Sequence, residues 1–160
     1  MFDENIPIKV FTSYAHKDEA LREELDVHLA MIKRQKAITI WNDRQIEDGT
    51  EWDAKIKKEL EEADIILLLF TPLFLASTYI YDVELKRAME RHEAGTARVI
   101  PIIIKPCDWL ATDFAKLQGI PKNGKPVTTW EDRDEVFLSI AQSLKKTIKI
   151  RQEKKKEAGI

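Results

Sequence analysis

The stretch that decides the fold runs from Ile8 to Asp18 and reads IKVFTSYAHKD. Its first half, through Thr12, is an apolar run of the kind that forms a buried β-strand, and a polar loop at Ser13-Tyr14 ends the run before a helix begins. In open α/β sheets, ligands bind in the crevice at the carboxyl ends of the strands. We therefore expect a ligand site next to Ser13 and Tyr14.

Strand and helix patterns alternate along the rest of the chain. Apolar residues recur at helical spacing from Leu21, from Trp52 and from Val136, and a further helix is expected from about Tyr79 to Glu93. Pro101 lies inside one expected strand and cannot donate a hydrogen bond, so we allow a bulge there. The expected strands are Ile8 to Thr12, Ala37 to Trp41, Ile65 to Phe70, Val99 to Ile104, and Pro126 to Thr129.

This alternation predicts a flavodoxin-like, three-layer α/β fold. Short connections between strands and helices imply a five-stranded parallel sheet in the order 2-1-3-4-5, with helices on both faces and right-handed crossovers. The unbroken run IILLLF at Ile65 to Phe70 fits the centre of such a sheet. The chain order reverses between the first and third strands, so the ligand should contact the loops Ser13 to Lys17 and Thr71 to Tyr81.

Composition is typical of a soluble globular protein in the cytoplasm. The 160 residues are 44% hydrophobic and 34% charged, with a formal net charge of −2 and a single cysteine, Cys107. Neither a signal peptide nor a membrane span is evident. We expect one domain over residues 6–148 and a basic tail or linker over 149–160, because seven basic and two acidic residues gather between Lys145 and Glu157. No direct contact with nucleic acid is expected, since that segment lacks interleaved aromatic residues.

Several familiar chemistries are excluded by their missing motifs. The five glycines form neither a GxGxxG fingerprint nor a Walker A loop, and no GxSxG nucleophile elbow is present. His16, His28 and His92 lie far apart and predict no metal site. A phospho-receiver domain would need aspartates where the chain has Thr12-Ser13 and Thr71-Pro72.

Four blocks then point to one family. They are residues 8–18, the segment from Trp41 to Trp52, the segment from Asp64 to Pro72 followed by FLAS, and STYIYDVEL from Ser77 to Leu85. Together they closely resemble the first box, the second-strand end with its BB loop, the third strand and the glutamate-bearing segment of the TIR (Toll and interleukin receptor homology) domain family, particularly its bacterial, NAD-cleaving branch.

The resemblance implies an enzyme that cleaves the nicotinamide-ribose bond of NAD, as an NAD nucleosidase or ADP-ribosyl cyclase in antiphage immune signalling. The family's catalytic glutamate maps to Glu84. Many active members carry tryptophan four residues earlier, where this chain has Ile80 between two tyrosines. NAD is expected as substrate, with no cofactor and no metal. The expected substrate-binding residues are Ser13, Tyr14, Ala15, His16, Asp43, Arg44, Glu47, Ser77, Tyr79 and Tyr81.

The resemblance also implies homotypic assembly through the BB loop, Asn42 to Trp52. The basic tail is compatible with a linker to a fused or partner sensor domain. Simpler interpretations stay open: Glu84 as a solvated surface residue, Asp43-Arg44 as a local ion pair, and the loop as ordinary exposed chain. The main alternative function is a non-catalytic adaptor that recruits other TIR domains.

Overall fold

A parallel sheet forms the centre of the molecule. The computed structural model describes residues 2–3, 5–36, 38–42 and 52–159, with the side chains of 52 and 53 left out. Within these residues the sheet has four strands in the order β2-β1-β3-β4: β1 (Ile8–Ser13), β2 (Ile38–Asn42), β3 (Ile65–Phe70) and β4 (Arg98–Ile103). All three neighbouring pairs are parallel. The expected α/β class and the reversal between the first and third strands are confirmed.

The expected fifth strand, Pro126 to Thr129, is wrong. Val127–Thr129 forms a single 3₁₀ turn (η7), and the Thr128 N–H donates to the Ile104 carbonyl over 3.0 Å. The place beside β4 is taken by Ile120, whose N–H donates to Pro101 O (2.9 Å) and whose carbonyl accepts from Ile103 N (2.8 Å). A single residue therefore stands where a fifth strand was expected.

Pro101 fits the sheet without a bulge. The pairing of β3 with β4 runs unbroken from Ile65–Arg98 to Phe70–Ile103. Ile103 donates toward Ile120, and Pro101, two residues earlier, faces the same side because main-chain groups alternate along a strand. The missing donor of Pro101 thus faces the edge of the sheet, where proline is tolerated.

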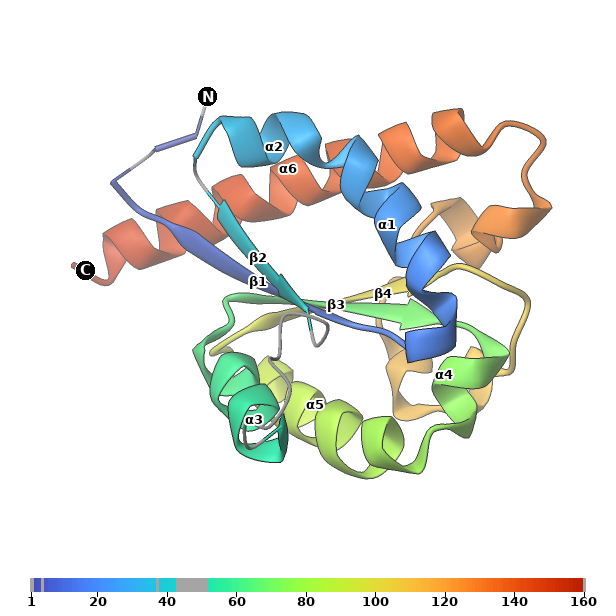
Figure 1. Cartoon of the computed structure of the whole chain (residues 1–160). Coiled ribbons are helices and arrows are strands. Elements are labelled where there is room, and N and C mark those ends of the chain that lie inside the picture. The colour runs from blue at the N-terminus through green and yellow to red at the C-terminus, as the bar shows by residue number, and fades with distance from the viewer. Residues whose placement is uncertain (1, 4, 37, 43–51, 160) are drawn as a thin grey trace.

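Helices cover both faces of the sheet (Figure 1). One face is covered by α1 (Glu19–His28), α2 (Ala30–Arg34) and α6 (Arg133–Glu157), and the other by α3 (Trp52–Glu62), α4 (Pro72–Ala76) and α5 (Lys86–Glu93). A π-helical segment, η3 (Ile80–Leu85), leads directly into α5. The short 3₁₀ segments η4 (Trp109–Ala111), η5 (Asp113–Lys116) and η6 (Lys122–Gly124) connect β4 to the last helix.

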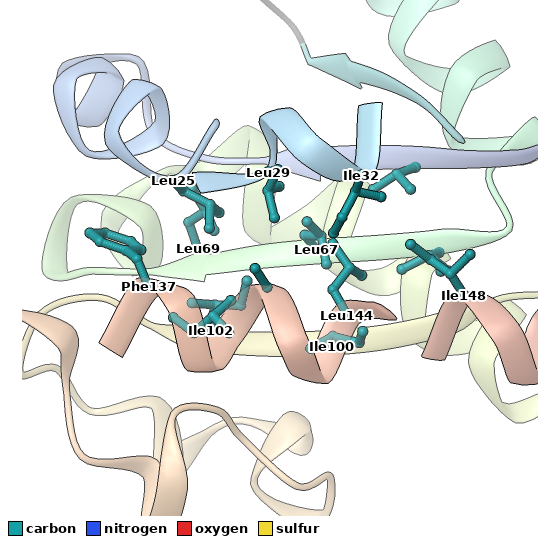
Figure 2. Packing of buried hydrophobic residues seen from close by; sticks show 14 of the residues in the cluster. Leu25, Leu29, Ile32, Leu67, Leu69, Ile100, Ile102, Phe137, Leu144 and Ile148 are labelled. Atoms are coloured by element: carbon teal, nitrogen blue, oxygen red, sulfur yellow. The ribbon is translucent and has the colours of Figure 1, made fainter. Parts of the chain in front are cut away.

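Alternating side chains of β3 supply two separate cores. Leu67 and Leu69 pack with α1, α2 and α6, as Figure 2 shows, whereas Ile66, Leu68 and Phe70 pack with the helices of the other face. A strand buried on both faces explains the unbroken apolar run in the sequence. Burying each such side chain stabilises the fold by about 1.5–3 kcal/mol.

The last helix, α6, does not end at residue 148, the expected end of the domain, but continues to Glu157. Its start is fixed by Asp132, whose carboxylate accepts from the N–H groups of Asp134 (3.0 Å) and Glu135 (3.2 Å). Val136, Ile140, Ala141 and Leu144 are buried, as their spacing predicts. No helix in the part of the chain that the structure describes is long and apolar enough to cross a membrane.

The far end of this helix holds the N-terminal segment. Gln152 is 5% exposed; its amide donates to the carbonyls of Asp3 and Ile6 (both 2.8 Å), and its oxygen accepts from Asp3 N (3.2 Å). Lys155 reaches the Asp64 carboxylate over 2.9 Å. The sequence alone indicated a basic tail from residue 149, but several of these residues make specific contacts with the domain.

Candidate functional site

A cavity of about 360 Å³ lies at the carboxyl ends of β1 and β3. It is the position predicted from the reversal of strand order, because all but one of the lining residues lie in the two segments, Ser13 to Lys17 and Thr71 to Tyr81, that follow these strands. The exception is Glu84, which stands on η3 beyond the second of these segments. The lining residues are Tyr14, Ala15, His16, Lys17, Leu73, Ala76, Ser77, Tyr79, Ile80 and Glu84.

Glu84 stands on the π-helical segment and is only 2% exposed. Ser77 stands just before the helical turn that leads into this segment, and it accepts a hydrogen bond from Ile80 N at its hydroxyl (3.3 Å) and from Tyr81 N at its carbonyl (3.0 Å). A π-helical turn inserts an extra residue into a helix, and such turns occur often at functional sites. The local fold thus places a carboxylate in the cavity wall, and solvation on an open helix surface, the simpler interpretation of Glu84, is excluded.

Tyr14 supplies a rigid part of the opposite wall. Its ring is fully buried, and its hydroxyl donates to the Glu19 carboxylate over 2.5 Å. The guanidinium of Arg22 lies 5.6 Å from the ring centre and forms an ion pair with the same carboxylate. The beginning of α1 therefore fixes the Tyr14 ring before any ligand arrives.

Two basic residues stand at the mouth of the cavity. His16 and Lys17 are both exposed, and the His16 ring lies 6.3 Å from the Tyr14 ring, centre to centre. The cavity therefore joins a buried carboxylate inside to positive or hydrogen-bonding groups outside. This arrangement suits a ligand with a cationic part and an anionic part.

A buried hydrogen bond ties the two loops together. The Thr71 hydroxyl donates to the Asp18 carboxylate over 2.5 Å and accepts from Phe74 N over 3.0 Å. Asp18 follows β1 and Thr71 follows β3, and both are nearly fully buried. This bridge holds the two walls at a fixed separation and caps α4 at the same time.

The structure brings six of the predicted site residues to the cavity and leaves two outside it. Ser13 is buried beneath the loop, and its hydroxyl makes no hydrogen bond with the described part of the chain. Tyr81 is 45% exposed and lines a different cavity beside α5. Asp43, Arg44 and Glu47, with most of the expected BB loop, fall outside the described residues. The six residues on the wall are Tyr14, Ala15, His16, Ser77, Tyr79 and Glu84.

Four lining residues were not individually predicted as ligand contacts. Lys17, Leu73, Ala76 and Ile80 all lie in or next to the two predicted loops, so strand order is the signal that could have found them. No cluster of three or more metal-ligating side chains occurs among the residues that the structure describes.

Comparisons with known proteins agree with the geometry. A family model described as TIR domain matches residues 10–138. The uncharacterized protein y4lF of Sinorhizobium fredii (strain NBRC 101917 / NGR234) is 48% identical over 136 residues, which are 85% of this chain and 42% of that protein. The chain thus spans about two fifths of the length of this curated relative.

Solved structures with a similar fold are also TIR domains. The TIR domains of the activated Roq1 resistosome align with a TM-score of 0.61 at 15% identity, covering 86% of this chain and 99% of that chain. That resistosome directly recognizes the pathogen effector XopQ. The TIR domain of the Toll-related receptor TRR-2 from Hydra magnipapillata aligns at 0.54 and 19% identity, covering 87% and 96%. A TIR domain from the RPS4 and RRS1 heterodimer aligns with a TM-score of 0.52 at 14% identity, covering 88% of this chain and 97% of that chain. Because the TIR family model matches residues 10–138, most of this chain, the chain belongs to the TIR domain family.

Proposed function

We propose that the cavity at the carboxyl ends of β1 and β3 binds NAD and cleaves its nicotinamide-ribose bond. The observation that carries this proposal is the Glu84 carboxylate, 2% exposed, in the wall of a cavity at the switch point of a TIR domain. A carboxylate is costly to bury. The place of Glu84 at the carboxyl ends of the strands, where ligands bind in such sheets, therefore favours a role in binding or catalysis.

The reaction needs only one carboxylate. Breaking the bond passes through an oxocarbenium-like state, as glycoside hydrolysis does, and ordinary glycosides also require a second carboxyl to protonate the leaving group. Nicotinamide leaves from a pyridinium that is already positive, so it takes the bonding electron pair and departs neutral. Water adds to the ribose carbon and loses a proton, giving ADP-ribose; in the cyclase variant, a nucleophile of the substrate itself adds instead. Glu84 would stabilise the developing cation on the ribose.

The remaining wall residues suit the other parts of the substrate. The partly buried Tyr79 offers aromatic surface for the nicotinamide, and the buried ring of Tyr14 supports the wall from behind. His16 and Lys17, at the mouth, would meet the diphosphate. The BB loop of a second copy would complete the site in an assembly, as the family resemblance implies.

The test compares three proteins: the original chain, Glu84→Gln, and the matched control Glu90→Gln. Glu90 lies one and a half turns further along the same helix, with an exposed side chain 3.5 Å from Arg87. Each protein is incubated with NAD at high concentration, and free nicotinamide is followed by chromatography. We expect Glu84→Gln to lose about 100-fold or more of the rate, a loss typical for removal of one electrostatic group, whereas Glu90→Gln keeps it. Equal release by all three proteins would contradict the role of Glu84.

Chromatography of the sugar product separates the two enzymatic outcomes. Linear ADP-ribose identifies hydrolysis, and a cyclic product identifies cyclisation. Either product supports NAD cleavage by this TIR domain; the proposed role in antiphage immune signalling is tested separately, by phage challenge of cells that carry the original chain or Glu84→Gln.

A non-catalytic adaptor is the second candidate, favoured by Ile80. This residue is 5% exposed and puts an aliphatic side chain into the cavity wall, where many active TIR domains carry tryptophan. TIR domains also pair with one another, as in the RPS4 and RRS1 heterodimer. If no nicotinamide appears at any protein concentration while sedimentation reveals self-association, the adaptor function is supported.

A further inference from the structure

A second cavity lies at the opposite, amino-terminal end of the sheet. Its volume is about 310 Å³, and its walls come from the end of α5, the first residue of β4 and the C-terminal half of α6. The side chains that give it its chemistry are His92, Arg98, Thr147, Ile150, Arg151 and Lys154. The proposed NAD site uses none of them.

The charge of this cavity is entirely positive. Arg98, Arg151 and Lys154 are its cationic side chains, and no acidic residue lines the cavity. Within the described ranges, none of these three side chains pairs with a carboxylate. Glu93, the acidic neighbour of His92 in the sequence, is bound to Lys116 over 2.8 Å.

Arg151 is already fixed in position. Its guanidinium donates to the carbonyls of Gly95 (3.4 Å) and Thr96 (2.8 Å), in the turn between α5 and β4. Since Arg151 holds this turn, a ligand must be bound mainly by the other two cations, Arg98 and Lys154. Both side chains are exposed, so they can turn toward a ligand without breaking a contact of the fold.

His92 adds an uncharged donor. Val99 N donates to His92 Nδ1 over 3.1 Å, which makes Nδ1 an acceptor and leaves the ring proton on Nε2. Burial, followed by the positive charge of Arg98, lowers the pKa of His92. At neutral pH the imidazole therefore offers one N–H and does not repel the neighbouring cations.

We infer that this cavity binds a small phosphorylated ligand, with Arg98 and Lys154 on the phosphate oxygens. A phosphate group offers several acceptor oxygens and negative charge, which match a site made only of donors and cations. The concave shape and a volume at the lower end of known ligand pockets favour a small molecule over a polymer. The cavity lining contains no Phe, Tyr or Trp ring of the kind that stacks the bases of single-stranded nucleic acid. Ile150, 57% exposed, supplies an apolar contact for the organic part of the ligand.

The experiment is an NMR titration with adenosine 5′-monophosphate, inorganic phosphate and adenosine at constant ionic strength. We expect the two phosphate-bearing probes to shift the His92 ring signals and the Gly95 and Arg98 amides in a saturable way, with dissociation constants of about 1 mM or below, while adenosine shifts none of them. Tighter binding of the nucleotide than of inorganic phosphate would identify a phosphomonoester as the ligand. Equal binding would identify the phosphate group alone.

Two double variants make the result specific. Arg98→Gln/Lys154→Gln removes two charges from the cavity and should weaken binding about tenfold or more. Lys122→Gln/Lys146→Gln removes two charges from exposed positions outside it and should leave binding unchanged. The inference is overturned if no probe shifts His92, if both double variants weaken binding equally, or if duplex DNA or RNA binds while the mononucleotide does not. Nicotinamide release should be the same in both double variants, so this test does not depend on the proposed function.

Discussion

At the amino-terminal edge of the sheet the buried guanidinium of Arg91 donates to four oxygens, whereas at the carboxyl-terminal edge the buried carboxylate of Glu84 lines a cavity. The four oxygens are the carbonyls of Leu60 (2.8 Å), Ala63 (2.6 Å) and Thr96 (2.8 Å) and the Thr96 hydroxyl (3.2 Å). Both side chains are less than 10% exposed. The Arg91 charge stabilises the fold, since its hydrogen bonds tie the end of α3 to the turn before β4. The Glu84 charge lies in the wall of the cavity at the opposite end of the strands, where the proposed function uses it.

The largest expected effect comes from Arg91→Met, which breaks the amino-terminal edge. The variant leaves buried carbonyl groups without donors, so we expect the free energy of unfolding to fall by about 3 kcal/mol or more, measured by urea denaturation. Arg87→Met, on the same helix, removes an exposed ion pair with Glu61 and should cost far less. Similar losses in the two variants would mean that the Arg91 network adds no special stability.

A smaller effect on stability is expected at the carboxyl-terminal edge from Ser77→Ala. The variant loses the hydroxyl that accepts from Ile80 N, so the free energy of unfolding should fall by about 1 kcal/mol or less. If the cavity cleaves NAD, nicotinamide release should fall more than this loss explains, because the segment carrying Glu84 loses its fixed start. Thr78→Ala, at the exposed neighbouring position, is the matched control and should change neither quantity. A Ser77→Ala protein with full activity would show that this cap does not position Glu84.

The smallest expected effect concerns the pH dependence at the amino-terminal edge. Burial, and then the charge of Arg98, lowers the pKa of His92 in the folded protein, while the unfolded chain keeps a value of about 6.5. The unfolded state therefore binds the proton more readily, and stability falls as the pH drops below about 6.5 toward the folded pKa. His92→Gln should reduce this fall, seen as a smaller change in urea midpoint between about pH 7.5 and about pH 5.5. An unchanged difference would rule out this contribution.

The sequence predicted the carboxyl-terminal edge far better than the amino-terminal one. The IILLLF run and the strand ending at Ser13 were enough to place the sheet and both loops of the cavity. Glu84 was found because a glutamate at this place matches a known family. Arg91 gave no comparable signal, because three of its four acceptors are main-chain carbonyls, and a carbonyl is present at every position of a sequence.

Two further differences have local physical causes. Tyr81 was predicted beside Tyr79 at the site, but residues two apart on a helix do not face the same side, so Tyr81 lines the neighbouring cavity. Pro126 to Thr129 has the β-branched residues of a strand, yet it is short and begins with a proline that cannot donate. Ile120, from a different part of the chain, pairs with β4 in its place.

The contact between Gln152 and residues 3 to 6 also determines how far the C-terminus of this domain can be truncated. The family match stops at residue 138, yet Ile140, Leu144 and Ile148 are buried and Gln152 closes over the beginning of the chain. A protein trimmed at the end of the match would lose about five turns of helix and uncover a strip of apolar side chains along β1 and β3. Anyone who expresses this domain alone should therefore keep the chain through Glu157, because the boundary set by packing lies well beyond the boundary set by family likeness.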